Sequence, residues 1–121
     1  MSGRPRRILV GVDGSDASQR ALDVAAELAG YGSSVAVVHV RDGEEATNVI
    51  DLARERLHRR QIAARYLELP GEAAREILEV AHLTDVDLVV VGRRRVPDRS
   101  RLGSVSSRVV GEARCDVLVV R

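Results

Sequence analysis

The sequence contains no lysine, and its 19 basic residues are all arginine. This absence excludes the phosphate-binding lysine of a Walker-A loop, a Schiff-base lysine, and the active-site lysine of a response-regulator receiver domain. Phenylalanine and tryptophan are also absent, and the aromatic residues are two tyrosines. Single-stranded nucleic acids bind by stacking on such side chains. With a net charge of +1, the chain is expected to have no nucleic-acid partner.

Cysteine, histidine and long apolar runs are also scarce. Cys115 is the single cysteine, which excludes an intrachain disulfide and any CxxC redox or zinc site. The three histidines, at positions 39, 58 and 82, lack the spacing of metal ligands, so no metal is expected. No apolar run approaches the roughly 18 residues of a membrane span, and no signal-peptide core follows the basic start. We therefore expect a cytoplasmic protein without membrane contact.

Apolar strand-like runs alternate with amphipathic segments along the chain, which is typical of a parallel sheet covered by helices. We expect one α/β domain over residues 1–121, with residues 1–6 as a basic N-terminal arm. The predicted strands are 7–12, 34–40, 62–69, 87–91 and 116–120. The predicted helices are 16–29, 44–60, one after Pro70-Gly71, and 105–113. Asp16 and Gln19 have the spacing of a capping box at the first helix.

One segment suggests a phosphate site. The strand that ends at Gly92 is followed by an arginine-rich loop and then by Gly103-Ser104, which opens a short helix. Glycine at the end of a strand allows a ligand to approach the main chain closely. The free N–H groups at a helix start bind anions. Ser104 is equally explained as a helix N-cap, and Ser106 as an ordinary residue of the first turn.

Four segments, in this order, resemble the universal stress protein family. They are Arg7–Ser15, Val37–Val40, Asp87–Gly92 with Leu102–Val109, and Cys115–Val120. The resemblance implies an adenine-nucleotide alpha-hydrolase-like fold with helices on both faces of a five-stranded parallel sheet in the order 3-2-1-4-5. In that order the chain reverses direction between strands 1 and 4, and open α/β sheets bind ligands beyond the strand ends at such a reversal. Asp13 and Gly92 follow those two strands.

The resemblance also implies ATP, bound with Mg, as the cofactor. ATP-binding members carry the motif Gly-x2-Gly-x9-Gly-Ser/Thr, and Gly92 and Gly103-Ser104 match its first glycine and its last pair. Arg95 stands in place of the second glycine, and the ten residues between Gly92 and Gly103 make the loop two residues shorter than the motif. Arg95 either blocks the approach of the backbone, or the arginines of the loop replace the missing N–H donors with charged, bidentate ones. These arginines are Arg93, Arg94, Arg95, Arg99 and Arg101.

The remaining candidate site residues follow from the same resemblance. Asp13, with Gly14 and Ser15, would lie at the adenosine end, although a strand-to-helix turn explains these residues equally well. Val40 matches the position whose backbone meets adenine, and it is also a natural core residue. Val105 and Ser106 continue the phosphate-binding segment. The expected cofactor-binding set is Asp13, Gly14, Ser15, Val40, Gly92, Arg93, Arg95, Gly103, Ser104, Val105 and Ser106.

Two functions are therefore expected. The first is an ATP-binding stress-response or signalling module that is not an enzyme and shows at most slow, incidental hydrolysis. The alternative is a dimeric protein-interaction module of the same family that binds no nucleotide and contacts an unidentified protein partner. In both cases the apolar last strand, Val117–Val120, is an edge that must be paired. As in related proteins, we expect it to pair with its copy in a two-fold homodimer.

Overall fold

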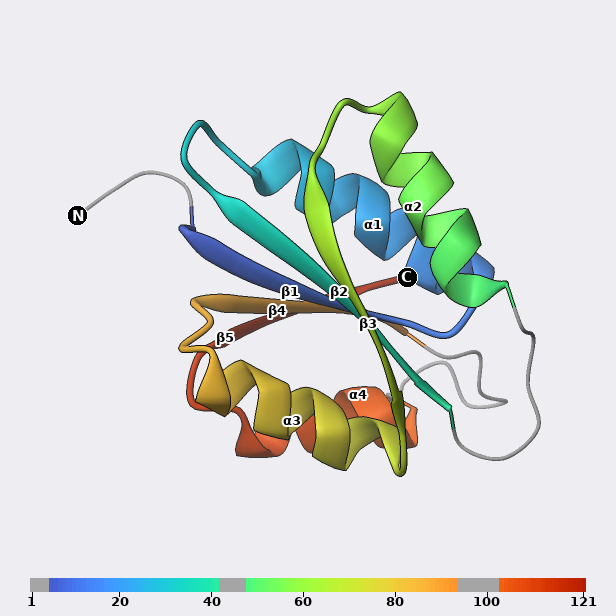
Figure 1. The fold of residues 1–121 in the computed structure, drawn as a ribbon. Helices are drawn as coiled ribbons and strands as arrows, with labels where there is room; N and C mark the ends of the chain where they lie inside the picture. The colour runs from blue at the N-terminus through green and yellow to red at the C-terminus, as the bar shows by residue number, and fades with distance from the viewer. Residues whose placement is uncertain (1–4, 42–47, 94–102) are drawn as a thin grey trace.

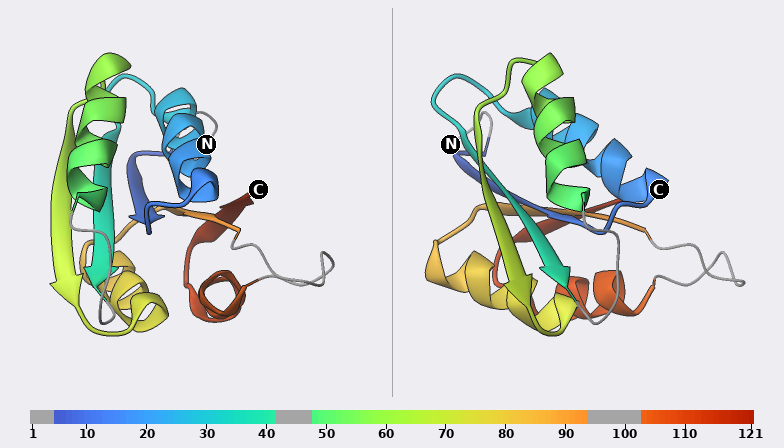
Figure 2. Two further views of the ribbon diagram at one scale, coloured as in Figure 1. Left: turned by 90° about the vertical axis from the view of Figure 1, so that its right-hand side faces the viewer. Right: turned by 45° about the vertical axis from the view of Figure 1, so that its right-hand side comes forward.

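The computed structural model describes residues 5–41, 48–93 and 103–121. Within these residues five parallel strands form one sheet in the order β3-β2-β1-β4-β5, which confirms the predicted order. The strands are β1 (Arg7–Val12), β2 (Ser34–Arg41), β3 (Ala64–Pro70), β4 (Leu88–Gly92) and β5 (Asp116–Val120). Figure 2 shows β3 and β5 at opposite edges of the sheet. Successive strands are added toward one edge up to β3 and toward the other edge from β4, so the strand order reverses between β1 and β4.

In the described part of the chain, four helices cover the two faces of the sheet (Figure 1). On one face lie α1 (Asp16–Leu28) and α2 (Val49–Arg59), and on the other lie α3 (Ala73–Leu83) and α4 (Ser104–Glu112). The observed ends of the elements mostly differ from the predicted ones by a residue or two. The predicted second helix differs more, since α2 begins at Val49 and residues 42–47 lie outside the described chain. In the described chain, no helix combines the length and the hydrophobicity of a membrane span.

The central strand β1 divides the core into two layers by alternation. Ile8, Val10 and Val12 face the layer beneath α1 and α2, whereas Leu9 faces the layer beneath α3 and α4. All four side chains are buried, and full burial of one such side chain stabilises the fold by about 1.5–3 kcal/mol. β1 lies between β2 and β4, with Gly11 paired to both Val38 and Val91. The residues that follow β1 and β4 therefore emerge next to each other.

An arginine on α2 fixes the two helices of one layer together. The Nε and Nη2 groups of Arg56 donate to the two carboxylate oxygens of Asp23 on α1, each at 2.8 Å. Its Nη1 group donates to Oε1 of Gln19 at 2.6 Å. The hydrogen bond from Arg56 lowers the pKa of Asp23 below its usual value. The predicted capping box of Asp16 and Gln19 is wrong, because the N-cap is Ser15 and the Gln19 side chain contacts α2 instead.

The first turn of α1 packs directly on the end of β4. A Cβ atom added to Gly92 would lie 2.6 Å from both the carbonyl carbon of Ala17 and the amide nitrogen of Ser18. These are backbone atoms, which cannot rotate away as a side chain can. The structure thus gives a different reason for glycine here from the close ligand approach that the sequence suggested. Gly92 allows α1 to lie against β4.

This contact predicts opposite effects for alanine at two glycines. Gly92→Ala should lower the free energy of unfolding by about 1–3 kcal/mol, because the added methyl group overpacks a backbone contact. Gly111→Ala is the matched control, since a Cβ atom there meets nothing within 4 Å and Gly111 lies in α4. It should raise stability by about 0.5–1 kcal/mol through helix propensity. Urea unfolding measures both changes, and a Gly92→Ala variant as stable as the parent would contradict the packing account.

Candidate functional site

The residues after β1 form a tight turn that leads into α1. The backbone N–H of Ser15 donates to Oδ1 of Asp13 at 2.9 Å, and Gly14 adopts a left-handed conformation with φ of +86°. Glycine adopts that conformation without the strain that a side chain would cause. The side chain of Ser15 caps α1 by accepting the N–H of Ser18 at 3.2 Å. Asp13, Gly14 and Ser15 therefore build the turn that the sequence predicted, and Asp13 and Ser15 are themselves exposed.

Ser18 holds this turn from inside the protein. Its side chain is buried, with 3% of the residue exposed. The Oγ atom accepts the backbone N–H of Asp13 at 3.3 Å and donates its proton to the carbonyl oxygen of Ser15 at 3.1 Å. One hydroxyl thus joins the end of β1 to the start of α1. The sequence analysis missed Ser18, although its position three residues after an N-cap serine could have indicated it.

A second buried serine holds the end of β4. Ser106 on α4 is 1% exposed, and its Oγ atom donates to the carbonyl oxygen of Gly92 at 3.2 Å. The next residue, Arg93, donates its backbone N–H to the carbonyl oxygen of Val120 at the end of β5. The sequence predicted Ser106 either as a cofactor-binding residue or as an ordinary helix residue. The structure shows a further role, which is to attach α4 to β4.

The start of α4 presents backbone donors. The N-cap is Gly103, so the predicted N-cap role of Ser104 is wrong, and Ser104 is the exposed first residue of the helix. The N–H groups of a helix's first turn have no partner within the helix, and glycine has no side-chain oxygen to accept them. Together with the positive end of the helix dipole, such donors favour a phosphate or carboxylate. Val105 is half-buried and packs against the core beneath α3 and α4.

Two further predicted residues are less informative. Val40 is buried in the layer beneath α3 and α4, and it pairs with Leu69 of β3. This agrees with its expected role as a core residue and does not test a contact of its backbone with adenine. Arg95 lies outside the described residues. Its proposed compensation for the missing glycine therefore remains a prediction.

The histidines and the cysteine show no arrangement for metal binding in the described residues. His39 on β2 is 3% exposed, and its Nδ1 atom lies 2.9 Å from Oε2 of Glu68 on β3. His58 and His82 are exposed on helices. Within residues 5–41, 48–93 and 103–121, no cluster of three or more His, Cys, Asp or Glu side chains could hold a metal ion. Burial raises the pKa of the half-buried Cys115 thiol, which makes it less reactive.

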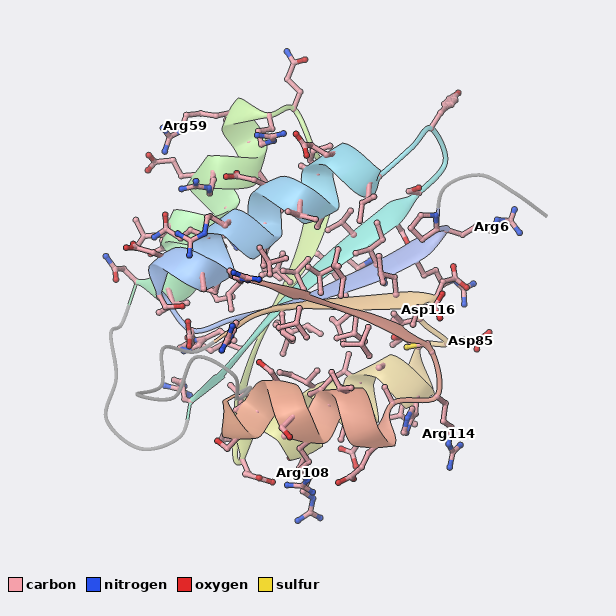
Figure 3. The ribbon with its side chains drawn as sticks, turned by 180° about the vertical axis from the view of Figure 1, so that it is seen from behind. Arg6, Arg59, Asp85, Arg108, Arg114 and Asp116 are labelled. Carbon is pink, nitrogen blue, oxygen red and sulfur yellow. The ribbon has the colours of Figure 1, made fainter. Side chains whose placement is uncertain are left out.

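An open hollow of about 420 Å³ lies at the other end of the strands. Its lining residues are Arg6, Arg7, Gly32, Ser34, Asp85 and Asp87. Figure 3 shows Arg6, Asp85 and Asp116 together at this amino-terminal edge of the sheet. Asp87 already accepts the backbone N–H groups of Arg6 and Arg7, at 2.9 and 2.8 Å, and so fixes the entry of the chain into β1. Asp87 thus has a structural role in this hollow, which lies at the opposite end of the strands from the turn at Asp13.

Comparison with known proteins agrees with this geometry. The model of the universal stress protein family matches residues 5–66 and 43–121. Universal stress protein YxiE of Bacillus subtilis is 30% identical, with 95% of this chain and 98% of that protein covered.

Two solved structures have the same fold. A universal stress protein of Archaeoglobus fulgidus in complex with dAMP is 28% identical, covers both chains completely and has a TM-score of 0.78. A universal stress protein in complex with cAMP has a TM-score of 0.82 at 23% identity, with 98% of this chain and 99% of that chain covered. The strand order, the turn at Asp13 and the helix start at Gly103 are thus found in a chain that belongs to the universal stress protein family.

Proposed function

We propose that this protein binds ATP with Mg at the carboxyl ends of β1 and β4. The observation that carries this proposal is the junction of two remote segments. The turn at Asp13 and the start of α4 at Gly103 both connect to Gly92, the first through the packing of α1 and the second through Ser106. An acidic turn and a row of backbone N–H donors thus flank one strand end. The complexes of two relatives with dAMP and cAMP support the same chemistry.

The chemistry of each side indicates how the nucleotide lies. Asp13 is exposed and acidic, so it suits the hydroxyl groups of a ribose and would repel phosphate. The start of α4, with the exposed hydroxyl of Ser104, suits the phosphates, and Arg93 follows Gly92 on the same side. The adenosine end therefore lies toward β1 and Val40, and the triphosphate end lies toward α4.

We expect binding rather than turnover. A hydrolytic site needs a base that can take a proton from water. Asp13 is the acidic residue of the turn, and its Oδ1 atom already accepts the N–H of Ser15. At most slow, incidental hydrolysis follows from this arrangement, which suits a module whose state of occupancy is read by other proteins.

Thermal unfolding with Mg-ATP tests the proposed binding. A ligand at 100 times its Kd stabilises the folded state by about 2.7 kcal/mol, which should raise the Tm by on the order of 10 °C for a domain of this size. Ser104→Glu should abolish the shift, because it places a negative charge at the expected position of the phosphates. Ser107→Glu on the same helix is the matched control and should keep the shift. No shift at millimolar Mg-ATP would favour the alternative function, a protein-interaction module without nucleotide.

We also propose that β5 pairs with its copy in a homodimer. In the described sheet β5 has β4 as its neighbour and lies at the edge. Its residues Val117–Val120 are all half-buried and apolar, which is the kind of edge that needs to be covered. The opposite edge, β3, carries two exposed charged residues, Arg65 and Glu68. A symmetric contact through β5 uses the same surface of both copies.

Sedimentation tests the dimer. The wild-type chain should sediment as a dimer, and Val119→Lys should yield a monomer because its charge lies on the paired edge. Leu67→Lys on β3 is the matched control and should leave the mass of the dimer unchanged, since Leu67 lies on the opposite edge and is 37% exposed. Thermal unfolding of both variants checks that they fold. A folded Val119→Lys dimer, or a wild-type monomer, would exclude pairing through β5.

A further inference from the structure

We infer that Ser18 and Ser106 are positioning residues, which hold the adenosine side and the phosphate side of the site in place through the main chain. The inference rests on the proposed nucleotide binding. Ser18 acts through the backbone of Asp13, and Ser106 acts through the carbonyl group of Gly92. Neither hydroxyl touches the nucleotide.

Burial and hydrogen bonding separate these serines from ligand-binding residues. Ser18 is 3% exposed and Ser106 is 1% exposed, whereas Ser15 and Ser104 beside them are exposed. A serine hydroxyl has one proton to donate. Ser18 gives its proton to the carbonyl oxygen of Ser15, and Ser106 gives its proton to that of Gly92. A phosphate oxygen would need these same protons, so both hydroxyls are committed to the protein.

Ser18 fixes where the turn at Asp13 points. The N–H of Asp13 is the first main-chain donor after β1, and the Oγ atom of Ser18 accepts it. The same Oγ atom is anchored to the carbonyl oxygen of Ser15, one helical turn earlier. Without this hydroxyl, the hydrogen bond from the N–H of Asp13 would be lost, and with it the attachment of the turn to the buried side of α1. The carboxylate of Asp13 would then be less well placed for a ribose.

Ser106 fixes the distance between α4 and β4. It lies in the first turn of α4, two residues after Ser104, so its bond to Gly92 places the N–H donors of the helix relative to the strand end. The segment between Gly92 and Gly103 is two residues shorter than the family motif and carries Arg95 in place of a glycine. Val109 packs α4 into the core, and the bond from Ser106 adds a direct attachment of the first turn of α4 to β4. Loss of this attachment should therefore weaken the binding of the phosphates and leave the binding of adenosine unchanged.

The two roles predict different patterns of lost affinity. Ser18→Ala should weaken adenosine and Mg-ATP by the same factor, because both ligands use the turn at Asp13. Ser106→Ala should weaken Mg-ATP by about tenfold, the equivalent of one lost hydrogen bond to a buried carbonyl group, and leave adenosine unchanged. A serine that only stabilised the fold would not discriminate between the two ligands.

Calorimetric titration of wild type and variants with adenosine and with Mg-ATP measures these patterns. Ser107→Ala is the matched control, since Ser107 is the exposed neighbour of Ser106 on α4, and it should bind both ligands as wild type does. Urea unfolding confirms that each variant is folded at the titration temperature. The inference is supported by a loss confined to Mg-ATP in Ser106→Ala together with an equal loss for both ligands in Ser18→Ala.

Three other outcomes overturn it and are distinguishable. If the wild type binds both ligands and Ser106→Ala weakens both equally, the serine acts on the fold alone. If the variants bind as the wild type does, the hydroxyls position nothing. If the wild type binds neither ligand, the proposed function fails, and this inference fails with it.

Discussion

The close packing of α1 on Gly92 is the contact on which the site depends. At this point the backbone of one segment, Ala17 and Ser18, lies where a Cβ atom of the other segment would be. Contacts between backbones cannot be relieved by a change of rotamer, so the relative position of α1 and β4 is fixed. The turn at Asp13 is the N-terminal extension of α1 and is therefore fixed with it. Residues about eighty positions apart in the chain become neighbours for this reason.

Two buried serine hydroxyls connect this contact to the two sides of the site. Ser18 connects it to Asp13, and Ser106 connects it to the start of α4. Polar groups buried this deeply must be satisfied within the protein, and here the required hydrogen bonds also align the two sides of the site. Two exposed groups remain for a ligand. The acidic turn repels phosphate, whereas the N–H donors of α4 attract it. In the proposed complex, that asymmetry would give the nucleotide a single orientation.

The sequence was sufficient for the architecture but not for the interior of the site. Alternation of apolar runs with amphipathic segments predicts the elements, and the motifs around Gly11 and Gly92 indicate the strand order through the family. The N-cap of α1 differs from the predicted one by one residue, because Ser15 and Asp16 are both cap-forming residues and only the geometry selects between them. The packing role of Gly92 was missed, since no local pattern reports that a distant helix packs on it. Ser18 and Ser106 were missed as anchors for the same reason.

The most direct measurement is the change in backbone amide NMR shifts when Mg-ATP is added to the isotope-labelled protein. The account predicts that the amides of Asp13–Ser15 and of Gly103–Ser106 shift together, with one common Kd, because one ligand contacts both sides. Shifts confined to Arg6, Arg7 and Asp87, at the amino-terminal edge of the sheet, would place the ligand at the wrong end of the strands. That result, or different Kd values at the two segments, would contradict a single site joined through Gly92.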